Sequence, residues 1–354
     1  MQNQKKTNIL LCLAFILLIY LYFDNYTAFS VYIKESMVLC YNTIIPSLFV
    51  FMVITSYISS LDICEIAGLP FVPMFRLLNI KDRRIVSYCV LGIISGFASG
   101  GYYINKIKNE YNCHDNMLGV ISILVSNNSP AFVISAVGHT MLDNIYAGII
   151  IYISIIVSSF ITAFIFSFIF SFPQPQLTKR NDIVKSGLSG AINSNVYAII
   201  NICGAVIFSF SVCKVVLLNT TNPAISVVFS IFSEVTSSCE IIIECFGKNL
   251  FLLCIALSFS PLSTYIQIKN NISCPNFSLK ILLLSKIIHI PLSLLILRIA
   301  VNIFPQSFAV YASNDINVNM HWNSPHISCC LFIMAVCFVI FFDKEIGVFT
   351  KSTK

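Results

Sequence analysis

Long apolar stretches, separated by short polar segments, occupy most of this sequence. A helix needs about 20 apolar residues to cross the hydrocarbon core of a bilayer. Ten stretches are candidates, at residues 7–23, 37–61, 85–104, 117–142, 144–172, 188–213, 223–246, 249–268, 280–304 and 327–342. All of them except 223–246 and 280–304 are free of Asp, Glu, Lys and Arg. The pattern predicts an all-α polytopic membrane protein.

The composition agrees with this fold class. Hydrophobic residues make up 57% of the 354 residues and charged residues 10%, with a mean hydropathy of +0.86, whereas a soluble domain carries about 25% charged residues. The net charge of +6 is not gathered into a basic stripe, which argues against nucleic-acid binding. The 14 cysteines show no C-x-x-C or Cys/His ligand spacing, so we interpret them as small core residues rather than as metal ligands.

The distribution of Lys and Arg tests the topology, because cytoplasmic loops hold an excess of basic residues. If all ten stretches cross and the N-terminus is inside, the inner loops hold 12 basic residues and the outer loops 7. If 85–104 and 223–246 are instead re-entrant hairpins, which leave on the side they entered, the inner side holds 16 and the outer side 3. The stronger bias favours eight transmembrane helices plus two re-entrant helical hairpins.

Polar centres distinguish the two hairpin segments from plain helices. The first has three glycines and two serines between Ser95 and Gly101, and the second places Glu234 two residues before Thr236. Two further stretches are interrupted at Ser126-Asn127-Asn128-Ser129-Pro130 and at Ser258 to Thr264 around Pro261, where proline removes an amide donor and breaks the helix. Such backbone is tolerated within a membrane only when it is buried in protein or lines a wet cavity.

The order of these elements repeats along the chain. Each set has a span, a hairpin, a broken span and a final span, and because three crossings separate the hairpins, the repeats are inverted. Inverted repeats with discontinuous helices are the architecture of secondary transporters. The predicted divisions are an N-terminal membrane anchor and loop at 1–36, a first inverted repeat at 37–172, a cytoplasmic linker at 173–187, a second inverted repeat at 188–304, and an external loop, last transmembrane helix and short tail at 305–354.

The residues at the four interruptions are the candidates for solute binding. Glu234 lies deep in an apolar run, where a carboxylate is costly unless paired or hydrated; it is interpreted as a substrate or coupling-ion contact, the alternative being a position near the membrane surface. The amides and hydroxyl at 127–129 suit a polar solute or Na⁺, or else hydrogen-bonded helix packing. The serines and glycines of 95–101 and 258–264 have two interpretations. They could present half-helix N-termini, which suit a carboxylate, or they could allow helices to approach closely. The predicted set is Ser95, Gly96, Ser99, Gly100, Asn127, Asn128, Ser129, Glu234, Thr236, Ser237, Ser260, Ser263, Thr264 and Gln267.

Charged residues in the 280–304 stretch leave two interpretations open. Lys286 and His289 are three residues apart and therefore share a helix face, where cations could neutralise a dicarboxylate. Lys286 and Arg298 are also close enough to the helix ends to reach the lipid headgroups. No H-E-x-x-H motif is present, and Phe97 replaces the first glycine of a G-x-S-G serine-protease motif. We expect neither an enzyme nor a metal centre.

Several motifs within residues 37–304 carry a resemblance to a known family. They are Pro46-Ser47-Leu48-Phe49, Ser95-Gly96-Phe97, the run from Ser126 to Phe132, Glu234-Val235-Thr236 and the run from Ser263 to Gln267. The sequence resembles the YlbJ-type sporulation integral membrane proteins of the nucleoside-recognition (Gate) domain group, which are related in architecture to concentrative nucleoside transporters.

The resemblance implies export of dipicolinate (pyridine-2,6-dicarboxylate) from the mother cell across the outer membrane that surrounds the forespore during sporulation. The residues themselves predict a secondary transporter of a small polar or anionic metabolite, with Na⁺ or H⁺ as coupling cation. The alternative is a non-transporting membrane scaffold or signalling component of spore formation. The expected partners are a small-molecule substrate and the lipid bilayer, without nucleic acid, and a homo-oligomer is left open.

Overall fold

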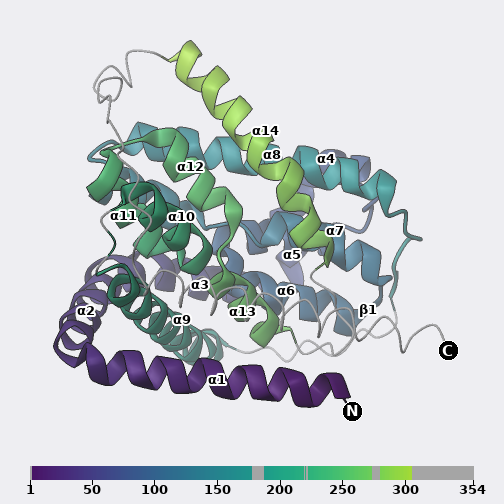
Figure 1. Ribbon diagram of the computed structural model, residues 1–354. Coiled ribbons are helices and arrows are strands. Elements are labelled where there is room, and N and C mark those ends of the chain that lie inside the picture. Colours follow the sequence, from purple (N-terminus) through teal and green to yellow (C-terminus); the bar gives the residue numbers. More distant parts are fainter. Residues whose placement is uncertain (1, 178–186, 219, 221, 273–279, 305–354) are drawn as a thin grey trace.

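The protein folds almost entirely as helices (Figure 1). The structure, a computed structural model, describes residues 2–177, 187–218, 220, 222–272 and 280–304. Its long helices are α1 (Gln2–Asp24), α2 (Tyr26–Leu39), α3 (Ile45–Ser59), α5 (Arg83–Ser95), α6 (Phe97–Glu110), α7 (Asp115–Val125), α8 (Ile145–Ile169), α9 (Leu188–Leu217), α10 (Pro223–Ser233), α11 (Val235–Phe246), α12 (Leu250–Phe259), α13 (Leu262–Asn271) and α14 (Lys280–Ile303). Shorter elements are the π-helices η1 (Cys40–Ile44) and η3 (Ala131–Met141), the 3-10 helix η2 (Asp62–Phe71), α4 (Val72–Leu77), and the paired strands β1 (Tyr111–Asn112) and β2 (Gln176–Leu177).

Five helical stretches among the described residues are long and apolar enough to cross a membrane. They are Tyr26–Ser59, Ile145–Ile169, Leu188–Leu217, Leu250–Ile268 and Lys280–Ile303. Large apolar side chains cover their outer faces; on α14, for example, Ile287 is 71% exposed and Ile303 63%. An extended exposed apolar surface suits lipid rather than water. The described part of the chain is that of an all-α, multi-pass membrane protein.

The N-terminal loop predicted for residues 24–36 is largely wrong. Only Asn25 separates α1 from α2, which continues through η1 into α3. Lys34 and Glu35 excluded this region from the apolar pattern, but both are exposed on α2, where a helix tolerates charge. The wider π-turn of η1 ends two residues before Pro46, which has no N–H to donate to the preceding turn.

The polar connection at 62–84, between two of the apolar stretches, is partly helical. It contains η2 and α4, and η2 packs against α5. The amide of Gly68 donates to the Ser87 hydroxyl at 3.0 Å, and the same hydroxyl donates to Glu65 O at 3.1 Å. These contacts explain why a segment with two prolines forms ordered short helices. The predicted last helix at 327–342, the rest of 305–354 and most of the linker lie outside the described residues.

Four helices end where the sequence carries its glycine, asparagine, glutamate and proline interruptions. Gly96 separates α5 from α6, residues 126–130 separate α7 from η3, Glu234 separates α10 from α11, and residues 260–261 separate α12 from α13. The stretch 117–142 is therefore two short helices rather than one span. Gly96 and Ser260 both have positive φ, 84° and 62°, so the chain bends sharply at these points.

Helices α5 and α6 fold back on each other around Gly96. Arg84 and Glu110, which lie at similar distances along the chain from Gly96, form an ion pair with 3.1 Å between Nε and Oε2. Tyr88 and Tyr103 stack with ring centroids 6.3 Å apart. The open ends of this helix pair therefore lie together.

Neighbouring connections meet at this open end. The Tyr111 hydroxyl donates to Asp82 Oδ1 at 2.9 Å, and burial together with this carboxylate raises the pKa of Tyr111. Asn79 Nδ2 donates to Phe172 O at 3.2 Å. Strands β1 and β2 pair antiparallel beside them. The segments at 79–82, 111–112 and 172–177 thus share one end of the molecule.

Two further contacts join segments that are distant in the sequence. Lys248 Nζ lies 2.8 Å from Leu142 O and 2.8 Å from Asp143 Oδ2, and this ammonium lowers the pKa of Asp143. Lys214, near the end of α9, pairs with Glu244 near the end of α11 at 2.9 Å. The ends of α9 and α11 are therefore adjacent.

The buried apolar side chains form two main clusters. One joins α3, η3, α8, α9, α10, α11 and α12, and the other joins α5, α6, α7, α13 and the start of α14. Phe97, the first residue of α6, packs against both clusters. The interruption at Gly96 therefore lies at the junction of the two halves of the core.

Candidate functional site

A cavity lies where the interrupted helices meet. It contains about 420 Å³ of space between atoms, the open mouth included. Six predicted site residues line it, from all four interrupted segments: Ser95, Gly96, Ser129, Glu234, Thr236 and Gln267. Residues that are far apart in the sequence and were selected for their polarity in apolar surroundings are thus brought to one place.

Three helix N-termini point their first turns toward this cavity wall. Phe97 begins α6, Val235 begins α11, and Ser129 immediately precedes the turn that begins η3, and all three residues line the cavity. Helix N-termini carry a partial positive charge, although the amides of Phe97, Phe132 and Ser237 in these first turns already have hydrogen-bond partners. The local field therefore favours an anionic or strongly dipolar group.

Glu234 is held in place as the N-cap of α11. Its carboxylate accepts hydrogen bonds from the Ser237 amide at 2.7 Å and from the Thr236 hydroxyl at 3.0 Å. The residue is 2% exposed, so the interpretation that places it at a membrane surface is not supported by its burial. An N-cap carboxylate is stabilised by the helix dipole, which explains how this acidic side chain is accommodated among apolar helices.

The interruption at Gly96 is in close backbone contact with the interruption at residues 126–130. The Phe97 amide donates to Asn127 O at 2.8 Å. The Ser129 hydroxyl accepts from the Phe132 amide at 3.1 Å and so caps η3. A Cβ added at Gly96 would lie 2.8 Å from Ser129. The tip of the α5–α6 pair therefore fits directly against the break that follows α7.

Eight predicted site residues do not line the cavity. They are Ser99, Gly100, Asn127, Asn128, Ser237, Ser260, Ser263 and Thr264. Gly100 serves close packing instead, because a Cβ there would lie 2.3 Å from Val125 O. The Ser237 amide and hydroxyl bond to Glu234. Ser237 therefore holds the Glu234 carboxylate, which does line the cavity.

The two asparagines hold backbone carbonyls that the interruptions leave free. Asn128 Nδ2 donates to Leu257 O at 2.7 Å, and Asn127 Nδ2 donates to Ile123 O and Leu124 O at 3.0 Å each. The side-chain oxygens of both asparagines are buried without a hydrogen-bond partner among the described residues. An unsatisfied buried acceptor is costly, so these oxygens are available to a donor that enters the region.

Lys286 and Arg298, both on α14, have different surroundings. Lys286 is buried and bonds to Ser258 O at 2.9 Å, whereas Arg298 is exposed on the outer face. The interpretation in which both reach the headgroups therefore fails for Lys286. Neither residue lines the cavity.

Apolar side chains complete the cavity wall, and sequence reasoning missed them. They are Ile44, Leu48, Phe97, Phe132, Ile202, Val206 and Val235. Ile44 and Leu48 flank Pro46, and this proline is the one sequence feature that draws attention to their segment. Ile202 and Val206 lie on α9, a continuous apolar helix whose sequence offers no sign of which face it turns inward.

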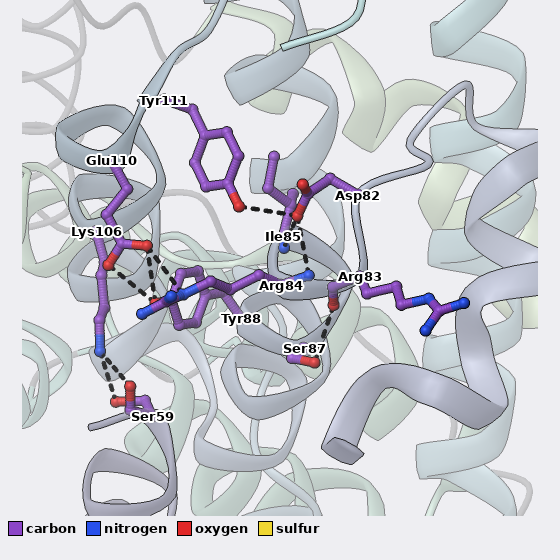
Figure 2. Close-up of polar contacts among 10 residues, drawn as sticks. All are labelled: Ser59, Asp82, Arg83, Arg84, Ile85, Ser87, Tyr88, Lys106, Glu110 and Tyr111. Atoms are coloured by element: carbon purple, nitrogen blue, oxygen red, sulfur yellow. Dashed lines mark hydrogen bonds and ion pairs between the residues drawn. The ribbon is translucent and has the colours of Figure 1, made fainter. Parts of the chain in front are cut away.

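A charged network at the open end of α5–α6 was likewise missed (Figure 2). The Tyr88 hydroxyl accepts from Arg84 Nε at 2.8 Å and lies 2.9 Å from Glu110 Oε1. Lys106 Nζ donates to the carbonyl and hydroxyl of Ser59 at the end of α3, and lies 4.9 Å from the centre of the Tyr88 ring. Figure 2 shows Arg83 pointing away from this group. The network closes the helix pair at the end opposite the cavity.

Comparison of the chain with protein-family models, with curated proteins and with solved structures gives no match.

Proposed function

We propose that this protein is a secondary transporter of a small polar metabolite, in which α5–α6 and α10–α11 are re-entrant hairpins of two inverted repeats. The observation that supports this most directly is the convergence of both helix-pair tips on one cavity, together with Ser129 and Gln267 from the proline-interrupted segments. Discontinuous helices that meet around a solute site are characteristic of secondary transporters.

Contacts at the ends of the helix pairs support the re-entrant arrangement. The bond between Asp82 and Tyr111 joins the two ends of α5–α6, and the ion pair between Lys214 and Glu244 joins the end of α9, which precedes α10, to the end of α11. If residues 85–104 crossed a bilayer, their two ends would lie about 30 Å apart. Direct contact between the ends is what a returning hairpin requires.

The charges around the cavity bear on the substrate. Glu234 is the only charged side chain among the described residues that line the cavity, and the helix N-termini supply partial positive charge. By resemblance, the first substrate to consider is dipicolinate, moved from the mother cell toward the forespore. A dicarboxylate would be repelled by an ionised Glu234, so we propose that it crosses together with a cation held near this carboxylate.

Flux measurements in proteoliposomes test the proposal. We expect uptake of radiolabelled dipicolinate, or of a nucleoside in parallel assays, that empty vesicles do not show. Ser129→Ala and Gln267→Ala should each reduce flux about tenfold, the equivalent of one lost hydrogen bond. Ser158→Ala is the control, because Ser158 is buried on α8 like Ser129 and its hydroxyl donates to Ile155 O of its own helix.

Glu234→Gln separates two roles of the carboxylate. If Glu234 holds the coupling cation, the variant should lose both flux and its dependence on the cation gradient. If the carboxylate only repels the anion, the variant should bind dipicolinate more tightly. Flux equal to that of empty vesicles under every gradient, for wild type and variants alike, would contradict transport and leave a membrane scaffold as the function.

A further inference from the structure

A second polar cluster is buried behind the cavity, where α14 packs against α8 and α12. Lys286 and His289 lie one turn apart on α14 and are 6% and 1% exposed. Lys286 Nζ donates to Ser258 O at 2.9 Å and lies 3.4 Å from His289 Nδ1. His289 Nε2 lies 3.1 Å from Ile155 O. Two titratable side chains thus bridge three helices inside the protein.

The hydrogen-bond partners define the protonation of this pair. A backbone carbonyl only accepts, so His289 Nε2 carries the hydrogen that faces Ile155 O, and Nδ1 of the neutral ring accepts from Lys286. A neutral lysine amine has two N–H groups, and Ser258 O and His289 Nδ1 satisfy both. The third N–H of an ammonium finds no acceptor among the hydrogen bonds of the described residues. Every N–H group of the two side chains therefore has a hydrogen-bond acceptor when both side chains are uncharged.

No carboxylate in the described helices faces this pair. Helix α14 packs against α7, α8 and α12, and the titratable side chains of these four helices, besides the pair itself, are Asp115, Tyr146, Tyr152, Cys254, Lys280 and Arg298. Asp115 is exposed and pairs with Lys108 at 3.2 Å. A buried ammonium without a counter-charge is strongly disfavoured, which agrees with the neutral arrangement.

We propose that Lys286 and His289 form a proton-binding site that is neutral at rest and takes up one proton during the working cycle. The lone pair of the Lys286 amine, which makes no bond in the neutral state, accepts the proton and yields an ammonium. The role of this proton in coupling rests on the proposed transport function, whereas the binding of the proton does not.

The end of α12 connects the proton site to the cavity. Pro261 has no N–H, so Leu257 O lacks its usual helical donor, and Asn128 Nδ2 replaces it. Lys286 binds the next carbonyl, that of Ser258. A charged donor bonds more strongly than a neutral one, so protonation tightens this end of α12. The chain continues from there into α13, which contributes Gln267 to the cavity wall.

Substitutions that fix the charge test the resting state. Lys286→Met cannot be protonated but removes the donor to Ser258 O and His289 Nδ1, so at pH 8 it should melt somewhat below wild type and above Lys286→Arg. Lys286→Arg carries a permanent charge and should melt roughly 5 °C lower or more. Lys34→Met and Lys34→Arg, at an exposed site on α2, should leave the melting temperature unchanged. A tolerated arginine together with a destabilising methionine would overturn the proposal.

Wild-type protein gives an independent measurement if both variants fail to fold. The ¹⁵N spectrum of full-length protein with labelled lysine side chains, in lipid bilayers, should contain one neutral amine resonance at pH 8 that converts to an ammonium as the pH falls. If every lysine resonance is an ammonium at pH 8, no neutral lysine exists and the site is refuted.

Transport assays then test coupling separately. With Lys286→Met, flux driven by a solute gradient should persist, whereas acceleration of flux by a pH gradient, expected for wild type, should be lost. Unchanged acceleration in Lys286→Met would overturn the coupling role. Absence of flux in wild type would instead contradict the proposed transport function and leave the spectroscopic result standing.

Discussion

At Gly96 the backbone and the packing both require glycine. The residue has φ of 84° and ψ of 178°, a region that is essentially accessible only to glycine. A Cβ would also lie 2.8 Å from the Ser129 backbone and side chain. Since this residue forms the tip of the α5–α6 pair at the cavity, its conformation sets the position of the α6 N-terminus.

Gly96→Ala should therefore destabilise the protein by about 2–3 kcal/mol, measured as the free energy of unfolding in denaturant. Gly204→Ala is the control, because a Cβ at Gly204 on α9 meets nothing within 4 Å. That substitution should be neutral or stabilise the helix by up to about 1 kcal/mol. Equal effects at the two positions would contradict the close approach at Gly96.

Individual site residues were predictable where their chemistry conflicts with their surroundings. A carboxylate in an apolar run marked Glu234, and consecutive amides before a proline marked Asn127 to Ser129. The partner of a side chain was not predictable in the same way. Asn128 bonds to Leu257 O, which is 129 residues away in the chain, and only the tertiary fold brings the break after α7 to the end of α12.

At the scale of elements, the α5–α6 pair is closed by charges that lie between its two helices. The side chains of Arg84 and Glu110 are 10% and 14% exposed, and the Tyr88 hydroxyl contacts both. The sequence presents these charges merely as the flanks of an apolar stretch. Because such flanks are expected to face water, their mutual pairing could not be inferred from the pattern.

Glu110→Gln should weaken this closure, because it leaves the Arg84 guanidinium buried without a carboxylate. We expect a loss of roughly 2–3 kcal/mol in the free energy of unfolding, below the full value for a wholly buried pair. Asp115→Asn, which breaks the exposed pair with Lys108, should cost less than about 1 kcal/mol. A loss for Glu110→Gln as small as that of the control would show that the network contributes little.

The extents of elements were less predictable than their interruptions. Glycine, proline and polar residues within the apolar stretches indicated the breaks near Gly96, Pro130, Glu234 and Pro261, because these residues act locally on the backbone. The hydropathy windows that set the bounds of the stretches were less reliable. The same windows missed the helix at 26–36, since exposed charges on one face of a helix lower the local hydropathy without ending the helix. They also missed η2 and α4, which depend on contacts with α5.

For the whole molecule, hydropathy and the distribution of basic residues were enough to indicate an all-α membrane protein with polar interruptions. They could not indicate the apolar wall contributed by Ile202 and Val206, because apolar residues are spread around α9 without one clear apolar face. The cavity arises only when α9, α3 and the four interrupted segments pack around one point. Its existence is a property of tertiary packing.

Everything proposed for the cavity depends on the two helix pairs returning to the side from which they entered. Four native lysines test this without mutation: Lys34 and Lys81 are exposed, and Lys108 and Lys248 are partly exposed. A membrane-impermeant amine reagent, applied to sealed vesicles of known orientation and read by mass spectrometry, reports which lysines share a side. Labelling after permeabilisation shows that all four are reactive.

The returning arrangement predicts that Lys81 and Lys108 are labelled from one side of the membrane, and Lys34 and Lys248 from the other. Ten full crossings would also separate Lys34 from Lys81, so these two residues serve as internal references. The decisive residue is Lys108. Labelling of Lys108 together with Lys81 is the result expected here, and labelling of Lys108 together with Lys34 would contradict the re-entrant α5–α6 pair and the cavity mechanism built on it.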